Sequence, residues 1–167
     1  SLLFVPPSFF FFPHLLMCHR DKHIATLHEI AWLASGEGMA VCAEMAAGRP
    51  ADSPASIARW REQLQADLVT AAWMQVQLRQ AARIKFSRAD RMIFDRIGLE
   101  QSTDEIVAAH KAKRFAGSER IADLCCGIGG ETLALAEHAP VLAVDLSGPR
   151  SAMAEHNAGV YGRKAEG

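Results

Sequence analysis

With 167 residues, half of them apolar, the chain is long enough for about one domain with its own hydrophobic core. Its formal net charge of −1 predicts no general attraction to nucleic acid or to an anionic membrane. The four cysteines form no C-x-x-C pair, so neither a disulfide framework nor a zinc site is predicted, and a reducing, cytoplasmic setting fits best.

The first residues of the chain are unusually apolar. Residues 1–17 include four consecutive phenylalanines, but three prolines interrupt them, so the stretch is too short and too broken to span a bilayer. It also lacks the basic start and the small-residue cleavage site of a signal peptide. We therefore interpret residues 1–22 as a leader that is disordered or not native, with Met17 as an alternative start. No standard ligand spacing supports a metal site in the neighbouring set of Cys18, His19, His23 and His28.

Residues 23–97 show helical periodicity and form a predicted helical N-terminal region. Two short helices fit before a stop at Gly48 and Pro50. The next helix is predicted to begin at Asp52, a capping residue, and to continue to about Ile84. We interpret the apolar and aromatic residues along its stripe as core rather than as a platform for base stacking.

A locally basic segment closes this region. Residues 79–96 contain two acidic residues and six basic ones: Arg79, Arg83, Lys85, Arg88, Arg91 and Arg96. The usual explanation of such a run is a solvated helix face. Contact with the phosphates of a nucleic acid is the alternative, and the sequence leaves both open.

Residue 98 begins the second predicted domain, which continues to residue 167. Gly98 precedes a further predicted helix. Ser102 and Glu105 match the S-x-x-E capping box, so this helix is expected to continue from there to about Ala116.

The most informative stretch follows, with the pattern strand, glycine turn, helix and strand. Ile121–Leu124 and Val141–Val144 are continuous apolar runs, which suit strands buried on both faces of a parallel sheet. Between them lie the glycine turn and a helix predicted from Glu131 to His138. The turn then lies at the carboxyl end of the first strand of a βαβ unit, and a helix over 151–157 follows the second.

Charge indicates which ligand this turn would bind. Gly127 and Gly129 allow the backbone to approach a ligand closely. Asp123, just before the turn, would repel a pyrophosphate but suits the cationic amino-acid end of S-adenosylmethionine (SAM). Cys125 replaces the first glycine of the dinucleotide-binding pattern, which also disfavours a nicotinamide cofactor. Asp145 ends the second strand 22 positions after Asp123 (145 − 123 = 22), where an acid commonly holds ribose hydroxyls.

These residues resemble a known family. D-L-C-C-G-I-G-G-E together with V-L-A-V-D-L is similar to motif I and the following acidic strand of class I SAM-dependent methyltransferases. F-S-R-A-D-R-M-I-F-D, S-T-D-E-I-V-A-A-H and A-E-H-N-A-G-V-Y-G are similar to flanking segments of the trimethylguanosine synthase group. Bacterial methyltransferases with a THUMP-like domain show a similar layout. The resemblance covers residues 85–162, about half of the chain.

The resemblance implies a fold, a cofactor and a set of binding residues. The fold is α/β, with a helical N-terminal region followed by the first βαβ part of a Rossmann-like sheet. The implied cofactor is SAM, with no metal. The implied cofactor-binding residues are Asp123, Cys125, Gly127, Gly129, Asp145, Leu146 and, at the amino-acid end of SAM, Thr103. Simple helix capping is the alternative for Thr103.

The resemblance also implies an activity. We expect transfer of a methyl group from SAM to a nitrogen of an RNA base, with a guanine exocyclic amine as one candidate. A small-molecule or protein methyltransferase is the enzymatic alternative, and a cofactor- or RNA-binding module is the non-enzymatic one. The N/D-P-P-Y/W motif that holds the target amine in this family does not occur in the chain. We therefore expect an N-terminal fragment of an enzyme, without turnover on its own and with its catalytic residues unknown.

Overall fold

The computed structural model describes residues 25–48 and 54–167. The predictions for the leader, Met17, Pro50 and Asp52 lie outside these residues. No helix in the described part of the chain is both long and apolar enough to cross a membrane. The same residues contain no group of three or more His, Cys, Asp or Glu side chains that could hold a metal ion.

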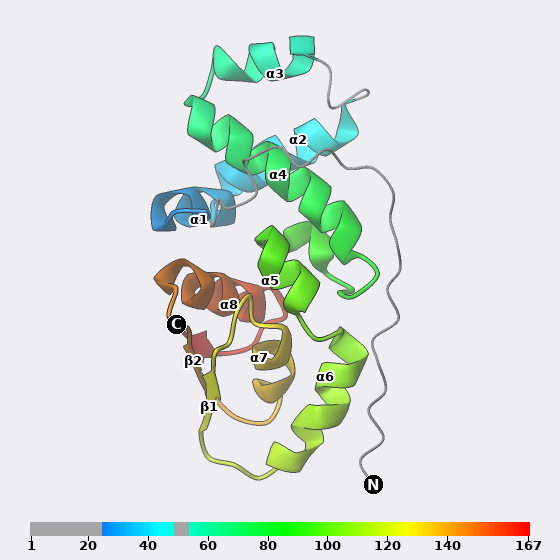
Figure 1. The fold of residues 1–167 in the computed structure, drawn as a ribbon, viewed down its shortest axis with the longest axis vertical. Helices are drawn as coiled ribbons and strands as arrows, with labels where there is room; N and C mark the ends of the chain where they lie inside the picture. The colour runs from blue at the N-terminus through cyan, green and yellow to red at the C-terminus, as the bar shows by residue number, and fades with distance from the viewer. Residues whose placement is uncertain (1–24, 49–53) are drawn as a thin grey trace, which may run out of the picture.

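Four helices form one end of the molecule (Figure 1): α1 (Leu27–Ala34), α2 (Gly36–Ala47), α3 (Pro54–Arg61) and α4 (Ala66–Ala82). The two predicted short helices are confirmed as α1 and α2. The single long helix predicted to reach Ile84 is wrong, because the chain turns between α3 and α4. The N–H groups of Gln63 and Leu64 both donate to the carbonyl of Trp60, and Gln65 is extended before α4 begins.

The connection between the two ends of the molecule is also helical. It contains η1 (Ala89–Arg91), α5 (Arg96–Gln101), α6 (Glu105–Ala112) and η2 (Lys113–Phe115). Gly98 lies inside α5 rather than before a helix. The predicted capping box is wrong, since Asp104 caps α6 by accepting from the Ile106 N–H at 2.8 Å. Ser102 instead donates to the Leu99 carbonyl, and Glu105 accepts from the backbone N–H of Ser87.

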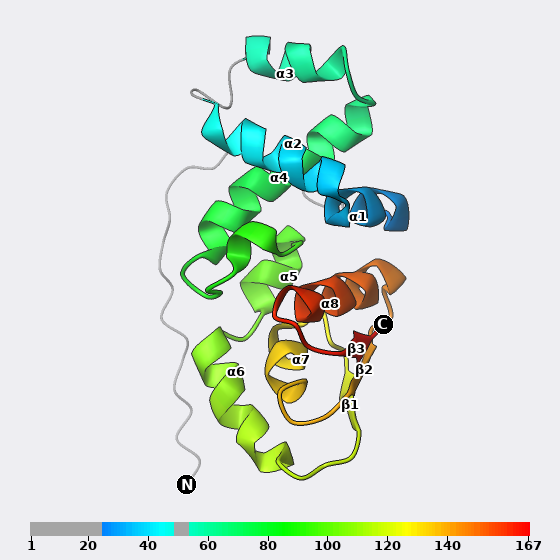
Figure 2. The same ribbon diagram turned by 180° about the vertical axis from the view of Figure 1, so that it is seen from behind.

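A parallel sheet with order β1-β2-β3 forms the other end (Figures 1 and 2). The predicted strands are confirmed with their bounds, as β1 (Ile121–Leu124) and β2 (Val141–Val144). The short β3 (Ala165–Glu166) pairs with β2 and was not predicted. The predicted helices correspond to α7 (Gly130–Leu135) and α8 (Gly148–Val160). The predicted α/β fold class, a helical N-terminal region followed by a partial Rossmann-like sheet, is therefore confirmed.

The sheet is covered on one face only by the described residues. Helices α6, α7 and α8 lie on the same side of it (Figure 2). Ile121, Val141 and Ala143 are buried on that side, whereas Leu124 and Leu142 on the other are 71% and 42% exposed. The prediction of strands buried on both faces is therefore wrong for the described part of the chain. The continuous apolar runs place apolar side chains on both faces of the sheet, but helices of the described residues pack against only one of these faces.

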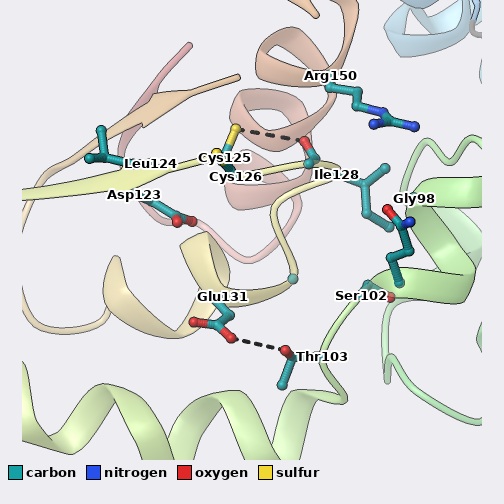
Figure 3. Close-up of a pocket in the computed structure, with 13 residues that line it drawn as sticks. Gly98, Ser102, Thr103, Asp123, Leu124, Cys125, Cys126, Ile128, Glu131 and Arg150 are labelled. Carbon is teal, nitrogen blue, oxygen red and sulfur yellow. Dashed lines mark hydrogen bonds between the residues drawn. The ribbon is translucent and has the colours of Figure 1, made fainter. Parts of the chain in front are cut away.

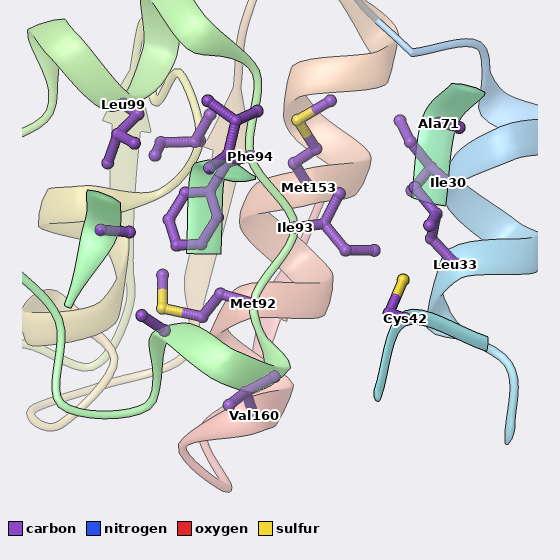
Figure 4. Close-up of a cluster of buried hydrophobic side chains, with 14 of the residues drawn as sticks. Ile30, Leu33, Cys42, Ala71, Met92, Ile93, Phe94, Leu99, Met153 and Val160 are labelled. Atoms are coloured by element: carbon purple, nitrogen blue, oxygen red, sulfur yellow. The ribbon is translucent and has the colours of Figure 1, made fainter. Parts of the chain in front are cut away.

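An extended segment, Met92–Asp95, joins the two ends of the molecule. Its Met92, Ile93 and Phe94 side chains are fully buried in one core that also includes α1 and α8 (Figure 4). Its backbone groups are paired by side chains instead of by a strand. Gln75 bonds both backbone groups of Phe94, and Asn157 bonds both of Ile93. Because buried backbone groups need partners, these polar residues fix the segment between α4 and α8.

Candidate cofactor site

The turn after β1 has an unusual backbone. Cys125 has a φ of 65°, and it is the one non-glycine residue with positive φ among the described residues. Gly127 and Gly129 follow with φ of 56° and 86°. Positive φ is disfavoured for residues with a side chain, so the turn needs glycine at these positions. A Cβ at Gly129 would also lie 2.8 Å from the Cα of Ala154, so this glycine lets the turn pack on α8.

A cavity of about 270 Å³ opens beside this turn (Figure 3). Four of the predicted cofactor residues line it: Thr103, Asp123, Cys125 and Gly127. Helix α5 and the loop between α5 and α6 form its other side. The lining residues that the sequence did not single out are Gly98, Gln101, Ser102, Leu124, Cys126, Ile128, Gly130, Glu131 and Arg150. The structure thus brings Thr103 to the cavity beside the glycine turn.

Asp123 is a half-buried acid in this cavity. Its carboxylate accepts a 2.6 Å hydrogen bond from the hydroxyl of Thr132, which is fully buried on α7. Burial raises the pKa of Asp123, the Thr132 hydrogen bond opposes this rise, and the neighbouring Glu131 adds to it. A buried carboxylate with a raised pKa is stabilised by a cation, because the cation favours its charged form.

Glu131 is a second acid in the cavity, which the sequence pattern indicated only as the start of a helix. Its carboxylate accepts from the Thr103 hydroxyl at 2.9 Å and forms an ion pair with Lys111 of α6. Hydrogen bonding to Lys111 lowers the pKa of Glu131. Its place directly after the glycine turn was a usable sign, since side chains in the first turn of such a helix lie near the ligand.

Asp145 and Leu146 lie at the end of β2. The two carboxylate oxygens of Asp145 accept from the backbone N–H of Gly127 at 3.0 Å and of Ser147 at 2.9 Å. Asp145 therefore holds the glycine turn in place, while each oxygen keeps a further lone pair for a ligand. Leu146 is fully exposed. Asp145, Leu146 and Gly129 do not contribute to the lining of the cavity itself.

Cys126, the second of two neighbouring cysteines, is not poised for nucleophilic chemistry. Cys126 is buried, and its thiol lies 3.7 Å from the Gly127 carbonyl (Figure 3). Burial, together with the Asp123 and Asp145 charges, raises the pKa of Cys126 to about 11. Since the thiolate is the nucleophilic form, this thiol is inert near neutral pH.

A buried ion pair fixes the wall of the cavity opposite the turn. Asp95, 4% exposed, caps α5 through the Gly98 N–H and accepts two hydrogen bonds from Arg150 of α8, at 3.1 and 3.2 Å. These bonds raise the pKa of Arg150. Bidentate pairing of this kind sets geometry as well as charge, and it holds α5 against the start of α8.

The basic segment is neither a uniform solvated face nor a uniform phosphate site. Arg79 is 7% exposed and donates to the Met92 carbonyl at 2.8 Å. Lys85 donates to three carbonyls at the end of α5, and Arg88 donates to the Val160 carbonyl at the end of α8. Lys85 and Arg88 therefore bind helix ends, and the phosphate interpretation of the segment stays a prediction. Burial also excludes a solvated face at Arg79.

Comparisons with known proteins agree with this geometry. Residues 118–166 match a family described as RNA cap guanine-N2 methyltransferase, and residues 26–82 match one described as a domain of unknown function (DUF8688). A crystal structure named "putative methyltransferase" from Porphyromonas gingivalis W83 matches with a TM-score of 0.55 and 19% identity. The match covers 67% of this chain and 33% of that one. No curated protein matches.

The chain thus spans about a third of the length of that solved structure. At 19% identity the structural likeness shows the fold alone, whereas the family match is to a sequence pattern that includes β1, the glycine turn and β2. Together they support a class I methyltransferase: residues 118–166 are similar to the family model, and the structural likeness shows the same kind of fold.

Proposed function

We propose that the full-length protein is a SAM-dependent methyltransferase that acts on a nitrogen of an RNA base. One observation carries the proposal. Two carboxylates, Asp123 and Asp145, stand at the carboxyl ends of adjacent parallel strands, on either side of a positive-φ turn that borders a cavity. Ligands of open α/β sheets bind at this edge, and the acids there favour a cationic ligand over a pyrophosphate.

The residues of the cavity fit SAM by their charge and by the space they leave. Asp123 and Glu131, with Thr103 on the facing wall, would hold the cationic amino-acid end. Gly127 would allow close approach, since a Cβ there meets no atom within 4 Å. Asp145 would bind the ribose hydroxyls through its free lone pairs, with Leu146 beside it. SAM supplies a methyl group on a sulfonium, and the main task of the protein is to align the acceptor with that group.

The proposed RNA substrate is supported by the family match over residues 118–166. A guanine exocyclic amine is the specific acceptor that this match favours. A cytoplasmic location belongs to the same proposal, because Cys42, Cys125 and Cys126 are free thiols. The absence of a membrane or metal partner is likewise part of the proposal.

Labelled SAM incubated with full-length protein and either total RNA or a protein extract would test the function. We expect label in RNA, on a base nitrogen after digestion to nucleosides. Label in protein alone, or only in small molecules, would replace the RNA substrate with one of the enzymatic alternatives. SAM binding without transfer to any fraction would favour a cofactor-binding module.

A further inference from the structure

A second cavity lies in the N-terminal helices, away from the methyltransferase motif. It has a volume of about 550 Å³ and is bounded by α2, α4 and η1. Met39, Cys42, Ala43 and Val76 contribute apolar side chains to its wall. Arg79, Arg83 and Arg91 also line it, with Asp90 as the one acid, so the charged lining sums to +2 (3 − 1 = 2). This local charge contrasts with the net charge of −1 for the whole chain.

Arg79 is a buried cation that forms no ion pair among the described residues. Its Nε donates to the Met92 carbonyl at 2.8 Å, and its Nη2 lies 3.4 Å from the Met39 sulfur, a weak acceptor. Within residues 25–48 and 54–167, no carboxylate forms an ion pair with it. Burial lowers the pKa of the Arg79 guanidinium, against opposing effects of Cys42 and Asp90. A buried charge is costly unless an opposite charge accompanies it, so the cavity is suited to an anion.

The backbone alone does not require a charged residue at this position. One helical turn earlier on α4, the neutral Gln75 pairs both backbone groups of Phe94. A neutral donor at residue 79 could pair the Met92 carbonyl in the same way. The guanidinium therefore supplies a charge and N–H groups that the Met92 carbonyl does not require. These groups are available to the cavity, which Arg79 lines.

Arg83 and Arg91 add exposed guanidinium groups to the same cavity. Arg83 follows Arg79 by four residues, one helical turn, and Arg91 comes from η1. Both are exposed, so a ligand can reach them without displacing the core. A buried arginine with two exposed ones suits a phosphate group, which arginine binds through paired N–H donors.

We propose that this cavity binds a backbone phosphate of the RNA substrate, with the attached nucleoside against Met39, Ala43 and Val76. The inference rests on the proposed RNA substrate. Phosphate contacts position a nucleic acid without reading its sequence, which is the role assigned to this cavity. The chain between residues 91 and 98 borders both cavities, through Arg91 here and Gly98 at the cofactor site. RNA held by the arginines is thereby positioned relative to the methyl donor.

Fluorescence anisotropy with a labelled single-stranded RNA oligonucleotide and full-length protein tests this inference. Arg83→Gln combined with Arg91→Gln should weaken RNA binding about tenfold or more, because charge-assisted hydrogen bonds are lost. The slope of log affinity against log salt should become shallower by about 0.7 for each phosphate contact removed. Arg59→Gln with Arg61→Gln, an equal charge change on exposed α3 residues outside the cavity, should leave both quantities nearly unchanged.

Arg79→Gln keeps a donor for the Met92 carbonyl and removes the buried charge. It should weaken RNA binding further, with a folded state verified by thermal unfolding and with unchanged SAM affinity. The inference would be overturned if the α3 control lost as much RNA affinity as the cavity variants, or if all cavity variants kept the RNA affinity of the wild type. Binding of a mononucleotide such as GMP without binding of RNA would overturn it as well. Failure of the proposed function is distinct, because it appears as absent SAM binding or methyl transfer while the arginine-dependent RNA affinity persists.

Discussion

The two cavities of this molecule carry opposite charges. The cofactor cavity has Asp123 and Glu131 against Arg150 in its lining, a sum of −1 (1 − 2 = −1), whereas the helical cavity has three arginines against one acid, a sum of +2 (3 − 1 = 2). A net charge of −1 conceals this difference, so the overall charge does not exclude a nucleic-acid partner. The two linings therefore suit ligands of opposite charge, and the segment between residues 91 and 98 borders both cavities.

The largest effect is expected from Asn157, which bonds that segment to α8 and also bonds the glycine turn. Asn157→Leu would leave the Ile93 N–H, the Ile93 carbonyl and the Ile128 carbonyl without their buried partner. Each unsatisfied group costs about 1–3 kcal/mol, so unfolding free energy should fall by about 3 kcal/mol or more. Urea denaturation measures this, with the exposed Gln77→Leu as control. A loss below about 1 kcal/mol would mean that water replaces the side chain and that the segment is not fixed by it.

A smaller loss of stability is expected from substitutions in the glycine turn, and these should leave RNA binding at the helical cavity unchanged. Gly129→Ala places a Cβ 2.8 Å from the Ala154 Cα at a φ of 86°, so strain and overpacking add. Gly127→Ala has positive φ but no atom within 4 Å of its Cβ. We expect about 1–2 kcal/mol from the backbone in both variants and about 1–3 kcal/mol more at Gly129. RNA affinity per folded molecule should stay unchanged; equal stabilities of the two variants would contradict this account of the turn.

Thr132→Val tests the acidic cavity through one hydrogen bond. The variant loses the 2.6 Å bond to Asp123, at a cost of about 1.5–3 kcal/mol. The bond lowers the pKa of Asp123, so its loss should raise that pKa further. SAM affinity needs the carboxylate and is lost as the pH falls through its pKa. Calorimetry across pH should therefore show the loss of SAM affinity at a higher pH in the variant than in the wild type. The same pH dependence in both proteins would mean that Asp123 does not contribute to SAM binding.

The smallest effect concerns His156 on α8, which bonds Arg91, a residue that lines the helical cavity. Its Nε2 donates to the Arg91 carbonyl at 3.1 Å, and burial lowers the pKa of His156. The folded protein therefore takes up this proton less readily than the unfolded chain, whose histidine has a pKa of about 6.5. Stability should fall as the pH drops below that value. His156→Gln should flatten this part of the urea-derived stability profile, and an unchanged profile would contradict the role given to burial.

Much of the sheet end was predictable because its determinants are local. Continuous apolar runs gave both strand bounds, and the glycines gave the turn with its two acids. Burial of only one sheet face was not predictable. An apolar run indicates that both faces of a strand can be covered, but it does not show whether the described part of the chain provides helices for both.

The helical end was predicted less well because its polar residues act over long sequence separations. Arg79 pairs a carbonyl of residue 92, and Lys85 pairs carbonyls near residue 100, so a run of basic residues gave no hint of which were structural. The helical cavity was missed for the same reason. Its arginines come from separate elements and meet only after α2, α4 and η1 pack together.

Calorimetry of SAM binding to the full-length protein tests the central claim most directly. Asp123→Asn and Asp145→Asn keep side-chain size but remove the charge, and each should weaken SAM by roughly ten- to a hundredfold, because hydrogen bonds to charged groups contribute about 1.5–3 kcal/mol. Thermal unfolding checks that Asp145→Asn, whose partners include the Gly127 N–H, still folds. The account predicts that the wild type prefers SAM to NAD and that both variants lose SAM affinity. Unchanged affinity in both variants, or tighter binding of NAD than of SAM by the wild type, would contradict the cofactor assignment.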